Sequence, residues 1–129
     1  MSYCECDYSD AEPVEFYRVE TVRAKKTYRC DECGGPVYPT ESYRRLVGKW
    51  GGSLDTIRTC HLCVELEQWA TISAPCFCTM VGELHERARE MVSDVAPTVP
   101  GFFYEYGRRM VRIRQRQRAY KAARAESKP

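Results

Sequence analysis

Eight cysteines in four close pairs are the residues of this chain whose type and spacing most clearly indicate chemistry. Two of the pairs, Cys30 with Cys33 and Cys60 with Cys63, have the spacing CxxC and stand more than twenty residues apart. A two-residue spacer lets both thiolates of a pair point inward from one tight turn, and two such pairs supply the four ligands of a tetrahedral Zn²⁺. We therefore expect these four cysteines to form a zinc site.

The alternative for these cysteines is disulfide bonding or burial as free thiols. Disulfides persist in oxidising compartments, which a chain reaches through an export signal. Residues 1–20 are acidic and contain no apolar stretch of the kind that a signal peptide carries. We therefore expect a reducing compartment, where paired cysteines bind metal or act in redox catalysis. A thioredoxin-like redox site would have one CxxC beside a βαβ pattern, so zinc is the favoured interpretation.

The segment between the two CxxC pairs has the pattern of a β-hairpin. Residues 41–47 have the composition of a strand, residues 54–59 predict the returning strand, and the glycine-rich residues 48–52 predict the reversal between them. Gly34 and Gly35 follow the first pair directly and provide a permissive backbone where the chain must turn past the metal.

A helix is predicted over residues 61–73, because apolar side chains recur at helical spacing from Leu62 to Ala70. The second CxxC pair would then lie in the first turn of this helix, whose partial positive charge favours thiolate over thiol. A knuckle, a hairpin and a helix in this order resemble the treble-clef zinc fold. The resemblance implies a core over about residues 25–73.

The remaining four cysteines have the spacing CxC and form an outer set around the CxxC pairs: Cys4, Cys6, Cys76 and Cys78. We expect them to form a second Cys₄ site, which gives two Zn²⁺ per chain. In the interleaved alternative each outer pair would join one CxxC pair, but the hairpin between the CxxC pairs disfavours it. Free thiols, a disulfide or a mixed site that includes His85 are further alternatives for the outer set.

The rest of the chain predicts a small α+β protein, a zinc-stabilised treble-clef-like module with additional C-terminal helices. Residues 14–23 have the β-branched and aromatic content of a strand. A second helical pattern begins at Thr79, and a third begins at about Phe102. The apolar stripe expected for the third helix consists of Phe102, Phe103, Tyr106, Met110 and Ile113. With 129 residues, we expect a zinc-binding domain over 1–100 and a basic C-terminal helix over 101–129.

Charge is distributed unevenly along the chain. The formal net charge is +2, but residues 107–129 contain nine Lys or Arg and one acidic residue, so this tail carries +8 and the remainder carries −6. An acidic body and a basic tail indicate two different partners. No apolar run approaches the length of a membrane span, and no large apolar face accompanies the late basic residues, so we expect no membrane partner.

Two groups of residues are candidates for binding nucleic acid or a protein partner. Lys49 and Trp50 at the expected hairpin tip combine an aromatic ring with positive charge, together with Arg44, Arg45 and Arg58 on the adjoining strands. Trp50 could stack on a base, anchor a protein, or fold back onto the zinc core. The candidates in the tail are Arg108, Arg109, Arg112, Arg114, Arg116, Arg118 and Lys121. For them the alternative is a solvated helix, or a face docked on the acidic body.

Catalysis has little support in the sequence. A complete Cys₄ site leaves no open coordination position at which the metal could activate water. The two histidines, His61 and His85, do not stand in the pattern of an HNH nuclease, and Pro75-Cys76-Phe-Cys78 lacks the CxxC spacing of a zinc deaminase. We expect His61 to be a polar residue on the first turn of the helix and His85 to be a core or boundary residue rather than a ligand. We therefore expect no enzymatic activity.

Several motifs resemble a group of small uncharacterised proteins encoded by tailed bacteriophages. They are the CxCD near the start, Tyr28-Arg-Cys-Asp-Glu-Cys-Gly, Tyr43, Gly48-Lys-Trp, Asp55-Thr56, Thr59-Cys-x-x-Cys63, Trp69 and Pro75-Cys-Phe-Cys78. The resemblance covers about residues 3–80 and implies a zinc-binding phage protein in the cytoplasm of the infected bacterium. It implies no particular activity and does not extend to the basic tail.

The sequence as a whole favours a non-catalytic accessory protein that binds nucleic acid or a host complex that handles nucleic acid. The second interpretation is a protein that inhibits a host enzyme or defence system through its acidic body. A zinc-dependent nuclease is the third.

Overall fold

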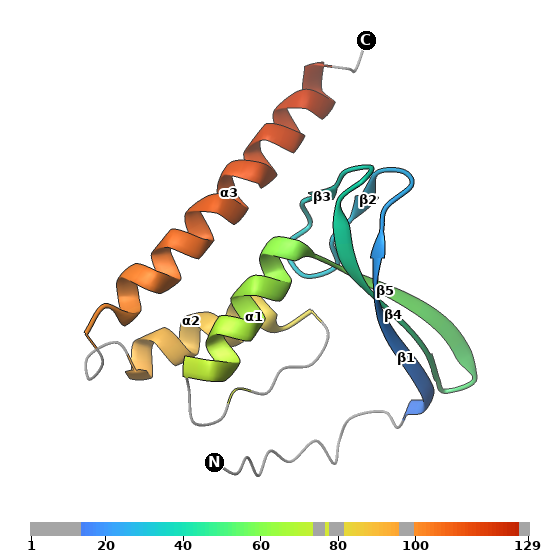
Figure 1. Cartoon of the computed structure of the whole chain (residues 1–129), viewed down its shortest axis with the longest axis horizontal. Helices are drawn as coiled ribbons and strands as arrows, with labels where there is room; N and C mark the ends of the chain where they lie inside the picture. The colour runs from blue at the N-terminus through green and yellow to red at the C-terminus, as the bar shows by residue number, and fades with distance from the viewer. Residues whose placement is uncertain (1–13, 74–76, 78–81, 96–99, 127–129) are drawn as a thin grey trace.

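A three-stranded antiparallel sheet forms one side of the protein in the computed structural model, which describes residues 14–73, 77, 82–95 and 100–126 (Figure 1). Its strands are β1 (Val14–Arg23), β4 (Ser42–Trp50) and β5 (Ser53–Cys60), in the order β1-β4-β5. The predicted strand over residues 14–23 is therefore confirmed. The end of the sheet that carries the β4–β5 turn projects away from the helices.

The turn between β4 and β5 consists of Gly51 and Gly52, with φ angles of 56° and 84°. Two consecutive residues with positive φ are typical of the two-residue hairpin turns whose twist matches that of the strands. The reversal is thus shorter than the expected 48–52. Lys49 and Trp50 belong to β4, where they pair with Leu54 and Ser53, because the glycine pair alone closes the turn.

A short two-stranded sheet carries the first CxxC pair. Its strands are β2 (Tyr28–Arg29) and β3 (Pro36–Val37), and the knuckle between them consists of residues 30–35. The N–H of Gly34 donates to the carbonyl of Cys30 at 2.9 Å, and the N–H of Cys30 donates to the carbonyl of Gly35 at 2.8 Å. Gly34 has a φ of 74°, a conformation that costs a residue with a side chain about 1–2 kcal/mol.

Three helices complete the described part of the chain: α1 (His61–Ser73), α2 (Leu84–Val95) and α3 (Phe102–Glu126). The bounds of α1 and the start of α3 agree with the prediction. The helix expected from Thr79 begins instead at Leu84, and Gly82 before it has a φ of 86°. Figure 1 shows α1 between the sheet and α3, which runs along the outside of the molecule up to β2 and β3.

The main core lies where the knuckle meets the three helices. Cys30, Cys60 and Cys63 belong to one buried cluster with Leu66 of α1 and Ile113 of α3. The other buried members of this cluster are Ala24, Val37, Tyr43, Leu62, Leu84, Ala88 and Met110. Three of the four CxxC thiols are therefore part of the main core.

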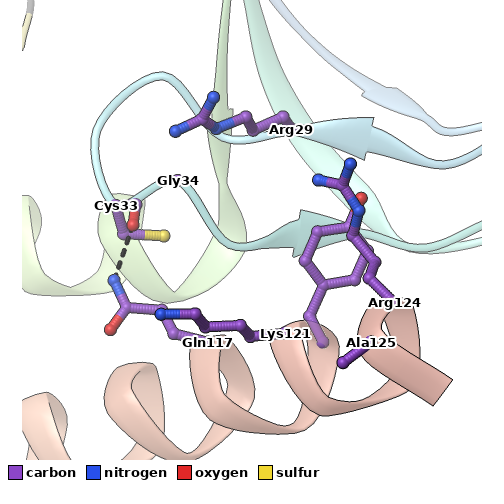
Figure 2. Close-up of a pocket in the computed structure, with 8 residues that line it drawn as sticks. Arg29, Cys33, Gly34, Gln117, Lys121, Arg124 and Ala125 are labelled. Carbon is purple, nitrogen blue, oxygen red and sulfur yellow. Dashed lines mark hydrogen bonds between the residues drawn. The ribbon is translucent and has the colours of Figure 1, made fainter. Parts of the chain in front are cut away.

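Helix α3 contacts both α1 and the knuckle. The ring of Trp69 on α1 lies 4.8 Å from that of Phe102, and the guanidinium of Arg109 lies 5.1 Å from the Trp69 ring. Further along the helix, the Gln117 side chain donates a 2.6 Å hydrogen bond to the carbonyl of Cys33 (Figure 2). Phe103 is 69% exposed and so lies outside the apolar stripe, in contrast to the expectation.

Among the described residues, no helix combines the length and the apolar composition that a membrane span requires.

Candidate metal centre

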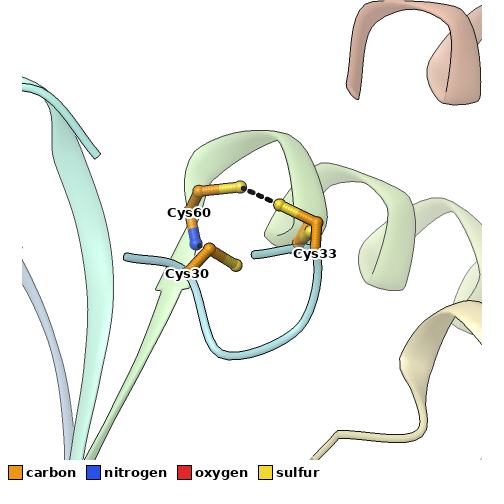
Figure 3. Close-up of side chains that lie close together, drawn as sticks. Cys30, Cys33 and Cys60 are labelled. Atoms are coloured by element: carbon orange, nitrogen blue, oxygen red, sulfur yellow. Dashed lines mark hydrogen bonds between the residues drawn. The ribbon is translucent and has the colours of Figure 1, made fainter. Parts of the chain in front are cut away.

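The four CxxC thiols meet at one point, as the spacing predicts. The Sγ atoms of Cys30, Cys33, Cys60 and Cys63 all lie within 4.8 Å of one another, and no disulfide joins them. Figure 3 shows three of these side chains, Cys30, Cys33 and Cys60, close together. The Sγ atoms of Cys33 and Cys60 are 3.8 Å apart. Four sulfurs placed tetrahedrally about 2.3 Å from a Zn²⁺ would be separated by about 3.8 Å. The cluster therefore has the donors and the size for one metal ion.

Secondary structure holds each thiol in place. Cys30 and Cys33 begin and end the first turn of the knuckle, Cys60 is the last residue of β5, and Cys63 lies in the first turn of α1. Cys60 thus precedes the helix instead of lying within its first turn. Cys63 is completely buried, whereas Cys33 is half-buried.

The protonation of the four thiols is strongly interdependent. Hydrogen bonds from the thiols of Cys33, Cys60 and Cys63 lower the pKa of Cys30. Because the thiols of Cys60 and Cys63 donate hydrogen bonds to the resulting Cys30 thiolate, the pKa of each of these two thiols is raised. Four adjacent thiols therefore cannot all lose their protons unless a cation neutralises them, and a divalent metal ion supplies that charge.

Backbone N–H groups donate to the sulfurs. Those of Glu32 and Cys60 donate to the Sγ of Cys30 at 3.4 and 3.3 Å, and that of Gly35 donates to the Sγ of Cys33 at 3.3 Å. Such hydrogen bonds favour the charged form of an acceptor. The fold thus already provides part of the stabilisation that thiolate ligands require.

The two spacer residues of the first CxxC pair attach the knuckle to other elements. Asp31 accepts a 2.7 Å hydrogen bond from the N–H of Arg58 on β5, and Glu32 accepts hydrogen bonds from the N–H groups of Gly82 and Leu84 at 2.9 and 3.1 Å. Glu32 therefore caps the N-terminus of α2, where a carboxylate is favoured. Burial nevertheless raises the pKa of Glu32. Sequence reasoning missed both roles, although the acidic Asp-Glu spacer was visible.

His85 is a neighbour of the thiol cluster. Its Nε2 lies 3.2 Å from the Sγ of Cys63. Burial lowers the pKa of His85, and the nearby cations Arg114 and Arg89 act in the same direction. A neutral ring with its proton on Nε2 can donate to the Cys63 sulfur, as groups around metal ligands commonly do. His61 is exposed.

The outer cysteines, Cys4, Cys6, Cys76 and Cys78, lie outside the described residues. The expected second metal site therefore stays a prediction.

The candidate binding residues of β4 are engaged in the fold. Arg44 forms two hydrogen bonds of 2.8 and 2.7 Å with the carboxylate of Glu67 on α1, and Arg45 pairs with Glu20 on β1. Lys49 also interacts with other groups of the protein. The side chain of Trp50 lies outside the described part of the structure, so its three alternatives stay open.

The seven cations of α3 that the sequence singles out, Arg108 to Lys121, divide into two groups on different sides of the helix. On one side, Arg108 and Arg109 pair with Glu105 at 3.1 and 2.7 Å, Arg112 pairs with Glu65 of α1 at 3.4 Å, and Arg116 pairs with Glu41. On the other side, at positions spaced by four and three residues, lie Arg114, Arg118 and Lys121. We call these three the basic ridge. They are exposed and form no ion pair with any other described residue.

Comparisons with known proteins found no family model, no curated protein and no solved structure that matches this chain. Functional conclusions therefore rest on the site itself.

Proposed function

We propose that Cys30, Cys33, Cys60 and Cys63 hold one structural Zn²⁺ in a treble-clef-like module. Four sulfur donors suit zinc among the common metals, and the sulfur separations suit a tetrahedral ion. A second Zn²⁺ in the outer cysteines is part of the proposal. The bound metal would neutralise the thiolates and stabilise the junction of knuckle, β5 and α1.

We propose a non-catalytic role for this metal, and hence for the protein. Four thiolates occupy every position of a tetrahedral ion, so no position is open for water or substrate. The nearest histidine, His85, contacts a ligand sulfur and is placed to stabilise it. These observations disfavour the zinc-dependent nuclease.

We propose that the protein binds nucleic acid through the basic ridge. The observation that supports this is the contrast between the two sides of α3. Acidic residues neutralise the cations on one side, which stabilises the packing of α3. On the other side three exposed cations keep their charge for an external partner. A row of unpaired Arg and Lys on a helix is typical of proteins that contact nucleic-acid phosphates.

The test compares two double variants that remove the same charge from α3. Arg114→Gln with Arg118→Gln removes two cations of the basic ridge. Arg108→Gln with Arg112→Gln removes two cations that are paired with carboxylates but are also exposed, at 53% for each side chain. Fluorescence anisotropy of a labelled oligonucleotide, titrated over a range of salt concentrations, measures binding.

The ridge variant should lose affinity, and its log–log salt slope should fall by about 1.4–1.8, because each lost phosphate contact removes about 0.7–0.9 from the slope. The paired-side control should keep nearly the whole slope. Equal losses in the two variants would mean that net charge alone drives binding. If the wild-type protein does not bind at moderate salt, the nucleic-acid proposal is wrong.

A protein partner is the second candidate, and one observation favours it. Ile72 at the end of α1 is 85% exposed, and Tyr104 and Val111 on one side of α3 are 68% and 51% exposed. Exposed apolar side chains on neighbouring helices suit a protein interface. In the setting that the phage resemblance implies, the partner would be a host protein of the infected bacterial cytoplasm. Stoichiometric co-purification that survives nuclease treatment and is lost in Ile72→Ser would support it.

A further inference from the structure

A groove lies between the knuckle and the C-terminal part of α3. Its volume is about 710 Å³, which is within the range of about 300–1,000 Å³ of small-molecule sites. The knuckle side carries Arg29 and Gly34, and the helix side carries Lys121 (Figure 2). The remaining lining residues are Cys33, Gln117, Tyr120, Arg124 and Ala125. We call it the knuckle groove.

The lining of the knuckle groove is strongly positive. It includes Arg29, Lys121 and Arg124, and no acidic side chain is among the described residues that line it. Arg29 and Lys121 form no ion pair with another described residue. Such a concentration of charge between two walls attracts an anion more strongly than the same charges spread over a convex surface.

None of these cations donates a hydrogen bond to a sulfur of the metal site among the described contacts. The sulfur atoms receive hydrogen bonds from backbone N–H groups and contact His85. The guanidinium of Arg29 lies over Gly34, where an added Cβ would stand 3.3 Å from its Nη2. Gly34 therefore leaves room for Arg29 to lie flat across the knuckle at the mouth of the groove. This placement suits an external anion.

The basic ridge leads into the knuckle groove, because Lys121 belongs to both. A strand that follows Arg114 and Arg118 along α3 would reach Lys121 and then Arg29 across the groove. Tyr120 and Arg124 provide a flat surface beside these cations, with the Arg124 guanidinium 5.6 Å from the centre of the Tyr120 ring. Aromatic rings and guanidinium planes are the surfaces on which unpaired bases stack.

We propose that the knuckle groove holds one nucleotide of a single strand, with its phosphate between Arg29 and Lys121 and its base against Arg124 and Tyr120. The inference rests on the proposed nucleic-acid binding by the basic ridge and makes single-stranded nucleic acid the ligand class. A nucleotide within a duplex is paired and stacked, and it enters a concave site only after it leaves the helix at a cost in energy.

The experiment fills the knuckle groove without changing the charge of the protein. Ala125 lines the groove and Ala122 does not, yet both are exposed alanines of α3. Ala125→Leu should weaken binding of a single strand of about 15 nucleotides by at least about fivefold, whereas binding of a duplex of equal length should not change. Ala122→Leu is the matched control and should leave both affinities unchanged. Zinc content and circular dichroism verify the fold of each variant.

A second pair of variants tests the charge. Arg29→Gln should weaken single-strand binding, and it should weaken binding of thymidine monophosphate measured by calorimetry. Arg23→Gln removes an exposed arginine that does not line the groove and should have little effect on either. Because Arg29 and Ala125 lie outside the basic ridge, these results are independent of the ridge variants.

The possible results separate the two proposals. Loss of single-strand binding in Ala125→Leu and Arg29→Gln, with duplex binding intact, supports the groove as the nucleotide site. Equal effects on single strand and duplex, or no effect on either, would overturn it and leave the ridge proposal standing. The mononucleotide could bind in an Arg29-dependent way while the protein shows no preference for single strands over duplexes. In that case the proposal that a single strand is the ligand is wrong. Absence of binding to any oligonucleotide would overturn both proposals.

Discussion

Replacing one of the four proposed zinc ligands should unfold most of the protein, and Cys33→Ser is the substitution that tests this. Structural Zn²⁺ contributes about 10–16 kcal/mol of apparent free energy in small zinc domains. The complete stability of a typical domain is about 5–15 kcal/mol. The other three proposed ligands, Cys30, Cys60 and Cys63, are members of the main buried cluster. Loss of the metal would therefore remove stability of the same size as the total and leave unpaired thiols in the core.

Cys33→His is the matched control, because Cys₃His is a common set of zinc ligands. Cys33 is the half-buried ligand at the edge of the knuckle groove, so a ring fits there more easily than at the fully buried Cys63. Elemental analysis measures zinc in each purified protein, and circular dichroism with thermal melting measures folding. We expect Cys33→Ser to be largely unfolded and depleted of zinc, and Cys33→His to keep both its metal and a cooperative transition.

Two results would refute the prediction for Cys33→Ser and Cys33→His. If Cys33→Ser melts cooperatively near the wild-type temperature and keeps its zinc, the four thiols do not act as one metal cage. If a chelator removes all metal from the wild-type protein without changing its circular dichroism, the core does not depend on the ion. Either result would require another explanation for the convergence of four thiols within 4.8 Å.

Two further predictions concern the outer cysteines and the sheet–helix junction. Elemental analysis should give about two Zn²⁺ per wild-type chain. Cys6→Ser should lose one of them, while the CxxC site keeps the other. One equivalent of zinc in the wild-type protein would refute the outer site. Arg44→Met should lower the free energy of unfolding by about 1–2 kcal/mol in urea denaturation, because it breaks a bidentate pair whose side chains are 26% and 29% exposed. Arg23→Met, at an exposed position of β1, is its control, and equal effects would contradict the assigned role of the pair.

Local patterns allowed the elements and the inner thiol cluster to be predicted. The helical spacing that begins at Leu62 reflects burial on one face, and the β-branched residues of 14–23 reflect the strand preference of their side chains. Each segment carries these properties by itself. The CxxC spacing similarly depends only on the geometry of a tight turn. These features needed no knowledge of how distant segments pack.

Contacts between distant segments could not be predicted in this way. Glu32 caps a helix that begins about fifty residues later in the chain, and His85 reaches a sulfur of α1. Either contact depends on where α2 packs, which no local pattern specifies. The apolar type of Phe103 predicts a place in the stripe, but the stripe follows the side of α3 that faces α1, and Phe103 lies beside it. The length of the β4–β5 turn depended on which glycines adopt positive φ.

The basic tail shows that the number of charged residues in a segment does not reveal which of them form ion pairs in the folded protein. Nine cations follow residue 106 in the sequence, yet in the structure four arginines of α3 pair with carboxylates of the body or of the helix itself. The same helix places Met110 and Ile113 in the core beside the cysteines. Truncation after Gly107 would therefore remove core packing together with charge, and a loss of nucleic-acid binding in that variant would have two causes. Substitutions confined to Arg114, Arg118 and Lys121 separate them, because these side chains are exposed and the buried side of α3 remains intact.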